Sequence, residues 1–213
     1  MAPLAAGRFI SCYDAQVPVA KLAMPGQAEK GSSPSSRALR AFLAHNPWNS
    51  TYPVTSSGWM LIAENTRKYV FGQRTGKVGM GAVVTLVNKG GSYLPDQLGG
   101  CGTVNPGPGE ESAVIEAATV SGRSLKVSWL NGSCGQGALP EQVVVRVETV
   151  QTGTSVHLLV VTQPNPALTT RPANTACAGV GLSSMAATTL SAPLGKRKLF
   201  NDAHVPAEAI TVG

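Results

Sequence analysis

The sequence predicts an all-β protein, an antiparallel β-sandwich that follows a flexible N-terminal arm and one short helix. Three observations predict this class. About seven runs of residues are rich in apolar and β-branched side chains, and clusters of Gly, Pro, Asn or Ser bound each run. Two of these runs alternate with the two-residue period of a strand. The connections hold no crossover helix of the kind that a parallel sheet requires.

The composition fits a folded chain whose surface is largely covered by other subunits. Of the 213 residues, 43% are apolar and only 13% are charged, whereas about 25% charged residues is usual for globular chains. Charge keeps a monomer soluble, so a surface this poor in charge indicates assembly, with an ordinary monomer as the alternative. The net charge of +6 is concentrated toward the two ends of the chain, which favours contact with a polyanion.

The first part of the chain predicts an arm. Residues 1–33 show no regular periodicity, and residues 24–36 are rich in Gly, Pro and Ser. Such a composition is typical of a flexible segment. We therefore expect a flexible, mildly basic arm over residues 1–35.

A short helix is expected next, over about residues 36–45, within a helix-and-connector segment of residues 36–56. Ser35 or Ser36 is suited to cap its first turn, and Pro47 ends it. The expected apolar face consists of Leu39, Phe42 and Leu43. This face predicts a helix that packs on the domain.

The β-sandwich is expected over residues 57–194, followed by a basic tail at 195–213. The expected strands are residues 58–65, 67–73, 77–88, 113–120, 123–132, 141–150 and 155–162, with an eighth in 180–194 and a last one at 209–212. In the fifth run Leu125, Val127 and Trp129 share one face, which places Trp129 in the core. In the sixth run Val143, Val145 and Val147 face one side, and Val144, Arg146 and Glu148 face the other.

The stretch "VFGQRTGKVGMGAVVTLVN" superficially resembles a phosphate-binding loop. Three residues, not the required four, separate Gly72 from Gly76, and Val78 stands where the hydroxyl that binds magnesium belongs. The residues that follow favour a strand rather than the helix whose amides would face a phosphate. We therefore expect a hairpin, with Gly79 and Gly81 marking a bulge or a close approach of the backbone.

No catalytic signature is complete, and we expect no enzyme activity. A triad of Cys134, His157 and Asp96 can be written down, but neither G-D-S-G-G nor G-x-S-x-G surrounds a nucleophile. The carboxylates that a glycosidase would need fall at the rims of expected strands, as solvated charges do. These are Glu110, Glu111, Glu116, Glu141 and Glu148.

Four widely spaced cysteines and three histidines form no metal-binding pattern, and we expect neither a metal nor a cofactor. The cysteines are Cys12, Cys101, Cys134 and Cys177. The N-terminal residues lack the pattern of an export signal, so we interpret the cysteines as thiols of an intracellular protein, although an even number would also allow two disulfides. No uninterrupted apolar stretch is long enough to span a membrane.

Eight basic residues are the candidates for nucleic-acid contact, because they lie toward the two ends of the chain and cations neutralise phosphates. They are Arg8, Lys21, Lys30, Arg37, Arg40, Lys196, Arg197 and Lys198. The last three form the densest basic run. Ordinary solvated charge is the alternative interpretation.

The order of these segments resembles that of coat proteins of small non-enveloped positive-strand RNA viruses. The resemblance rests on the arm "MPGQAEKGSSPSS", the helix "SSRALRAFLAHNP" and the strand series from "GWMLIAEN" to "SVHLLVVTQPNP". It implies a jelly-roll sandwich, a structural role in a many-subunit shell around an RNA genome, and a location in the virion after synthesis in the host cytoplasm. Arms of such proteins are often rich in Arg and this one is not, which suggests a shell held mainly by contacts between subunits.

Two other functions remain open from the sequence. A β-sandwich module that binds a carbohydrate or a protein would present an aromatic platform, for which Trp48, Trp59 and Trp129 are the candidates. A hydrolase on a β-barrel would require a nucleophile such as Cys134.

Overall fold

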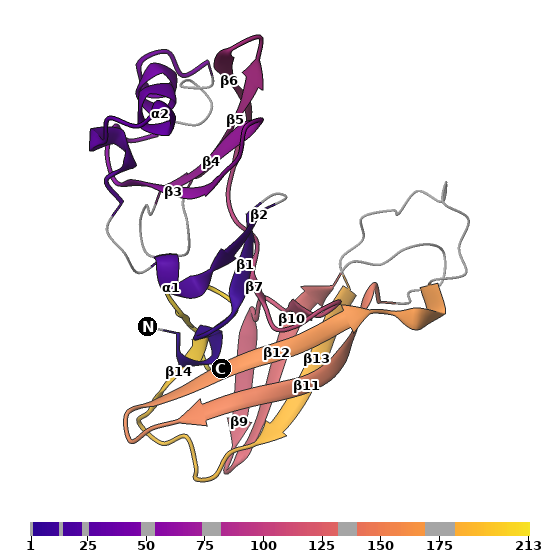
Figure 1. Ribbon diagram of the computed structural model, residues 1–213. Coiled ribbons are helices and arrows are strands. Elements are labelled where there is room, and N and C mark those ends of the chain that lie inside the picture. Colours follow the sequence, from indigo (N-terminus) through magenta and orange to yellow (C-terminus); the bar gives the residue numbers. More distant parts are fainter. Residues whose placement is uncertain are drawn as a thin grey trace. The chain divides into compact units, whose positions relative to one another are not determined.

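The computed structural model describes residues 2–12, 15–22, 26–47, 54–73, 82–131, 140–168 and 182–213. Within these residues the protein is built mainly of antiparallel strands, which confirms the predicted fold class. The chain forms two compact units (Figure 1). The inserted unit is Phe9–Gly102, and the sandwich unit comprises Met1–Arg8 and Thr103–Gly213.

Eight of the nine described strands of the sandwich unit form two sheets. Its strands are β7 (Val104–Asn105), β8 (Glu111–Ser112), β9 (Ala117–Ser121), β10 (Ser124–Asn131), β11 (Gln142–Gln151), β12 (Ser155–Pro164), β13 (Leu182–Thr189), β14 (Lys198–Asn201) and β15 (Glu208–Ala209). One sheet has the order β13-β10-β9. The other has the order β11-β12-β14-β15, and β8 pairs with β12. All described pairs are antiparallel except β12 with β14.

The core of the sandwich unit lies between these two sheets. It consists of Ala113, Ile115, Ala118, Leu125, Val127, Trp129, Val156, Leu158, Val160, Ala186, Leu190, Leu194 and Leu199. Strand β10 buries every second residue, as its sequence predicts. Trp129 is 2% exposed, which confirms its predicted place in the core.

Strand β11 departs from the strict alternation expected of it. Its pairing with β12 shifts register between Val144 and Arg146. A shift of this kind inserts an extra residue and interrupts the two-residue period. As a result Val144 and Val145 are both exposed, rather than on opposite sides of the sheet.

The first residues of the chain pack on the outer side of the five-stranded sheet. The short 3₁₀ helix η1 (Pro3–Ala5) contacts β11 and β12. Leu4 packs against a second apolar cluster that consists of Leu159, Val161 and Ala203, and Ala2 and Ala5 are buried. A segment this short shows no periodic apolar pattern, so the sequence alone does not predict this packing.

The inserted unit combines a helix with a four-stranded sheet. Its elements are β1 (Phe9–Cys12), β2 (Ala15–Pro18), α1 (Val19–Leu22), the 3₁₀ helix η2 (Ala28–Lys30), α2 (Pro34–Ala44), β3 (Trp59–Glu64), β4 (Lys68–Gln73), β5 (Ala82–Lys89) and β6 (Ser92–Gly99). A further 3₁₀ helix, η3 (Pro166–Leu168), belongs to the sandwich unit. The sheet of the inserted unit has the sequential order β3-β4-β5-β6.

Helix α2 is the short helix that the sequence predicts. Ser33 caps it by accepting the backbone N–H of Ser36 at 3.1 Å, and Pro34 occupies the first turn. Ser35 and Ser36, the expected caps, lie instead inside the helix, because a proline is suited to the first helical position and moves the start forward. Leu39 and Phe42 are buried in a core with Trp59 and Phe71.

The stretch that resembles a phosphate loop lies in a hairpin, as expected. Strands β4 and β5 pair antiparallel from Lys68 with Val87 to Gln73 with Ala82. Described residues of the second strand begin at Ala82, so the expected bulge at Gly79 and Gly81 lies outside the described residues. No helix follows Gly76 in the described part of this hairpin.

The expectation of a flexible arm over residues 1–35 needs correction. Residues 2–8 are packed on the sandwich, and β1, β2, α1 and η2 lie in the rest of this segment. These elements have three or four residues each, too short to show a period in the sequence. The division into units, at Arg8 and at Gly102, also differs from the expected boundaries at 35, 56 and 194.

A disulfide bond joins Cys12 to Cys101, with Sγ atoms 1.97 Å apart. It corrects the interpretation of these cysteines as thiols. The two residues lie near the two ends of the inserted unit, and the N–H of Gly102 donates to the carbonyl of Ser11 at 2.8 Å beside it. The bond therefore links the first and last residues of the inserted unit to each other. Cys134 and Cys177 lie outside the described residues.

Candidate functional site

The eight basic residues expected to contact nucleic acid are divided between the two units. Lys21, Lys30, Arg37 and Arg40 belong to the inserted unit, and Arg8, Lys196, Arg197 and Lys198 belong to the sandwich unit. The four lysines are exposed. The four arginines make hydrogen bonds within the chain, so part of their donor capacity is used to hold the fold.

The arginines of the set hold loops. The Arg40 guanidinium donates to the carbonyls of Glu29 and Gly31. Arg197 donates to the carbonyls of Ala192, Pro193 and Leu194 and so orders the turn before β14. Lys196 and Lys198 flank Arg197 and are exposed, which leaves them as the best placed pair for an anionic partner.

The Cys134–His157–Asp96 combination is not assembled in the described residues. Cys134 lies outside them, and Asp96 belongs to β6 of the inserted unit, 4.0 Å from the Lys89 ammonium. His157 instead bonds through Nδ1 to Oδ1 of Asp202 at 2.8 Å, and its ring stacks on Phe200 with centroids 5.0 Å apart. Asp202 is fully buried, and its Oδ2 accepts the backbone N–H of Leu4 at 2.8 Å.

The bonds of Asp202 hold His157 and the N-terminal segment in place. The buried Asp202 carboxylate bonds on one side to His157 and on the other to the N-terminal segment, so each oxygen has a partner. A histidine oriented by a carboxylate resembles half of a hydrolytic triad. Among the described residues, no hydroxyl or thiol nucleophile is hydrogen-bonded to this histidine.

A chain of four alternating charges lies on the outer side of β11. Arg146 bonds to both oxygens of Glu110, and its Nε donates to Oε1 of Glu148 at 2.8 Å. Arg8 Nη2 donates to Oε2 of Glu148 at 2.7 Å. The hydrogen bonds from Arg146 lower the pKa of the Glu110 carboxyl below its usual 4.5, and Glu110 in turn raises the pKa of Arg146. The network ties Arg8 and the loop at Glu110 to the sheet.

We expect this network to make the sandwich unit sensitive to acid. A carboxyl whose pKa is lowered by folding stabilises the protein above about 4.5, and the contribution is lost as the pH falls through the lowered pKa. Glu110→Gln should therefore reduce the fall in urea midpoint between pH 5 and pH 3. The variant Glu116→Gln removes one exposed carboxylate outside the network and should keep the wild-type dependence. Equal acid dependence of wild type and Glu110→Gln would contradict the prediction.

The outer face of the β13-β10-β9 sheet carries few charges. We call it the outer sheet face and define it by Ala117, Thr119, Lys126, Ser128, Leu130, Ser183, Met185 and Ala187. Lys126 is the single charged residue among all residues of the three strands. Met185 is 73% exposed and Leu130 is 62% exposed.

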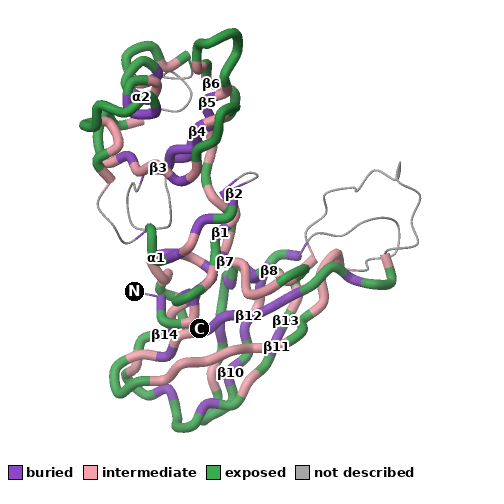
Figure 2. The backbone as a smooth tube through the Cα atoms, in the orientation of Figure 1, coloured by how far each residue is buried: buried purple, intermediate pink, exposed green. Residues whose placement is uncertain are grey.

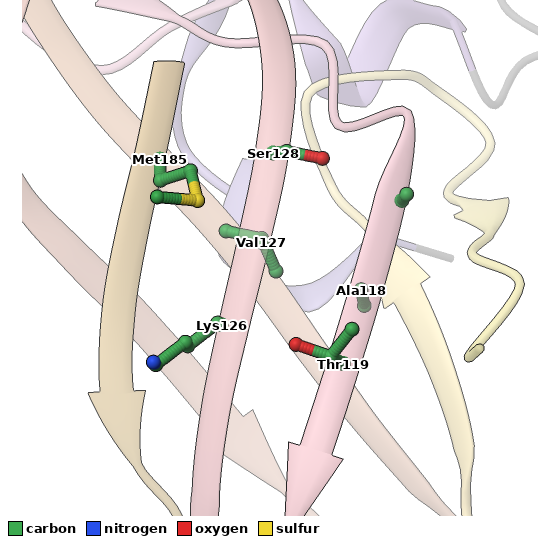
Figure 3. A pocket seen from close by; sticks show the side chains of 7 residues that line it. Ala118, Thr119, Lys126, Val127, Ser128 and Met185 are labelled. Atoms are coloured by element: carbon green, nitrogen blue, oxygen red, sulfur yellow. The ribbon is translucent and has the colours of Figure 1, made fainter. Parts of the chain in front are cut away.

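The residues of this face align in rows across the strands. Ser128 pairs with Met185 on one side and Ala117 on the other, and Lys126 pairs with Ala187 and Thr119. Figure 3 shows Met185, Lys126 and Thr119 on three neighbouring strands around a shallow hollow. Its volume of about 110 Å³ is well below the roughly 300 Å³ or more of ligand pockets. The shape suits contact with another surface better than an enclosed small molecule.

The candidate aromatic platform for a carbohydrate is not formed by the two described tryptophans. Trp59 is fully buried in the core of the inserted unit, and Trp129 lies in the core of the sandwich unit. Figure 2 shows buried and exposed stretches along the tube of each unit. Trp48 lies outside the described residues.

Several contacts of these sites cannot be predicted from the sequence. Asp202 lies 45 residues from His157, and Arg8 lies 140 residues from Glu148, so neither pair leaves a local pattern.

The described residues hold no group of three or more side chains suited to a metal ion. Among the same residues, no helix combines the length and apolar character needed to cross a membrane.

Comparison of the chain with protein-family models, with curated proteins and with solved structures finds no match.

Proposed function

We propose that this chain is a structural protein that assembles with copies of itself, with the viral coat subunit as the specific form of this function. The observation that carries the proposal is the outer sheet face, a sheet surface with two large exposed apolar side chains and one charge. Surfaces of this kind mark contacts with other proteins. A chain with a net charge of +6 repels its copies least where charge is absent.

The disulfide supports a place outside the reducing interior of a cell. Disulfides persist on virions and cell surfaces and in secreted proteins, and they are rare in the cytosol. The Cys12–Cys101 bond is therefore compatible with a coat protein in a particle. A shell around RNA would use Lys196, in the turn before β14, and Lys198, at the start of β14, which are both exposed. Lys21 and Lys30 of the inserted unit would join them.

Sedimentation velocity and negative-stain electron microscopy of the purified full chain test this function. We expect association that increases with protein concentration and changes little with salt, because the proposed contact surface is almost uncharged. Binding to RNA should instead weaken as salt rises, since it rests on released counterions. A chain that sediments as a monomer at high concentration, with and without RNA, would overturn the proposal.

A paired variant separates assembly from genome binding. Lys196→Ala combined with Lys198→Ala should lower the amount of RNA that sediments with the protein and leave the association of the protein alone unchanged. Neither lysine belongs to the outer sheet face. Loss of both properties together would show that RNA drives the assembly and that the face does not.

A further inference from the structure

Strand β13 forms one edge of its sheet. It pairs with β10 over eight consecutive residue pairs without a register shift, from Thr189 with Ser124 to Leu182 with Asn131. Among the described residues, no strand pairs with its second edge. An edge strand presents a row of backbone N–H and C=O groups that can pair with another strand.

The other long edge strands of the protein carry features that block such pairing. Strand β6 contains Pro95 and Asp96, and Pro removes a backbone donor. Strand β11 has a register shift and carries Arg146 and Glu148. Natural proteins use these devices to prevent pairing between sheet edges.

The edge strands β2, β7 and β15 have four residues or fewer. Two further edges are covered. At β3, the Glu29 carboxylate accepts the N–H of Trp59 at 3.2 Å, and the pairing with β4 shifts register between Leu61 and Ala63. At β9, Gly213 donates its N–H to the carbonyl of Ala118 at 3.0 Å, where Val212 forms a parallel bridge. Strand β13 contains no proline, no charge and no register shift.

We infer that β13 pairs edge to edge with β13 of a second copy, so that two three-stranded sheets join into one continuous sheet. The inference rests on the proposed self-association and places its contact at the β13 edge of the outer sheet face, rather than over the whole face. An uncharged edge selects an uncharged extended partner, and a second copy supplies one without like charges in opposition. Two identical antiparallel strands also satisfy the two-fold symmetry of a closed dimer.

The side chains of β13 are compatible with this pairing. Ser183, Met185 and Ala187 point to the outer side and are exposed, and Ser184, Ala186 and Thr188 point to the inner side. All except Met185 are small or carry a hydroxyl group, so they do not obstruct a neighbouring strand. A two-fold axis close to Met185 would place the two methionines opposite each other and cover both.

Two variants at exposed positions of the outer sheet face distinguish edge pairing from contact through the sheet face. Met185→Lys places a cation on the edge strand, where the symmetric copy places another opposite it. Leu130→Lys adds the same charge on the central strand β10. We expect Met185→Lys to raise the dimer dissociation constant at least about tenfold, measured by sedimentation velocity, and Leu130→Lys to change it less than about threefold.

The outcomes separate this inference from the proposed function. If Leu130→Lys weakens association as much as Met185→Lys, or if neither does, edge pairing is wrong while association of the wild type still supports the function. If the wild type does not associate, both the edge pairing and the proposed function are wrong. Circular dichroism melts check that each variant is folded, which their exposed positions favour.

A cross-linking experiment tests the geometry directly. In a two-fold pair with the axis near Met185, Met185→Cys should form a covalent dimer under mild oxidation, because directly opposed residues have Cβ atoms about 5 Å apart. Leu130→Cys lies on the neighbouring strand and should remain a monomer on a non-reducing gel, as should the wild type. Equal cross-linking of both cysteine variants would overturn the edge-to-edge arrangement.

Discussion

Reduction of the Cys12–Cys101 disulfide is expected to lower the free energy of unfolding of the inserted unit by about 4 to 5 kcal/mol. The two cysteines are 89 residues apart in sequence. A cross-link of this span removes much of the conformational entropy of the unfolded chain, and the chain-entropy model gives about 4.7 kcal/mol for a loop of about 100 residues. Since whole domains are stable by only about 5–15 kcal/mol, we expect the reduced unit to be close to unfolding.

Tryptophan fluorescence can follow the unfolding of the inserted unit separately from that of the sandwich unit. The variant Trp129→Phe removes the tryptophan of the sandwich unit and leaves Trp48 and Trp59, both within Phe9–Gly102. In this background, the urea midpoint with reductant should fall well below the midpoint without it. The double variant Cys12→Ser, Cys101→Ser should show the low midpoint under both conditions.

The identity of the bond needs its own check. Mass spectrometry of a digest without reductant should find the peptides of Cys12 and Cys101 linked to each other. Equal midpoints with and without reductant, or a linked pair other than Cys12 and Cys101, would contradict the prediction. Cys134 and Cys177 are unchanged in every variant and serve as the constant background.

Strands with a simple environment could be predicted from the sequence. Strand β10 lies between two neighbours and covers a core on one side only, so its sequence alternates and Trp129 could be assigned to the core. Strand β12 has consecutive buried residues because η1 and Leu4 cover its outer side as well. Its apolar run still identified a strand, but the run could not show what covers its second face.

Strand β6 shows where the same reasoning fails. Its sequence includes Pro95 and Asp96, which are unfavourable in a strand, and it lies outside the expected strands. The position at the sheet edge explains the difference, because a proline there leaves no partner without its hydrogen bond. The pairing with β5 also shifts register between Thr85 and Leu86.

The outer sheet face could be predicted only in part. The alternation in β10 identified Lys126 and Ser128 as outward residues, but the sequence did not show that β13 lies beside them. Contacts between distant segments, such as Asp202 with His157, depend on the parallel pairing of β12 with β14. The low charge of the chain indicated assembly, whereas the location of the contact required the strand order.

The sandwich itself predicts a strong contrast between two leucines of one strand. Leu125 of β10 is fully buried between the two sheets, and Leu130 of the same strand faces outward. Leu125→Ala removes buried methyl groups and leaves a cavity, so it should cost about 2–5 kcal/mol of unfolding free energy. Leu130→Ala should change the unfolding free energy by less than about 0.5 kcal/mol.

Urea denaturation measures both variants in a Trp48→Phe, Trp59→Phe background, in which Trp129 is the remaining tryptophan and lies in the core that Leu125 helps to form. The pair tests the register of the sheet as well as its packing. The side chains of a strand alternate, so a slip of one residue in the pairing of β10 would exchange its two faces. Leu130→Ala would then be the costly change and Leu125→Ala the mild one. The outer sheet face, with Met185 and Leu130 exposed, would be assigned to the wrong side of the strand, and the proposed contact between copies would lose its basis.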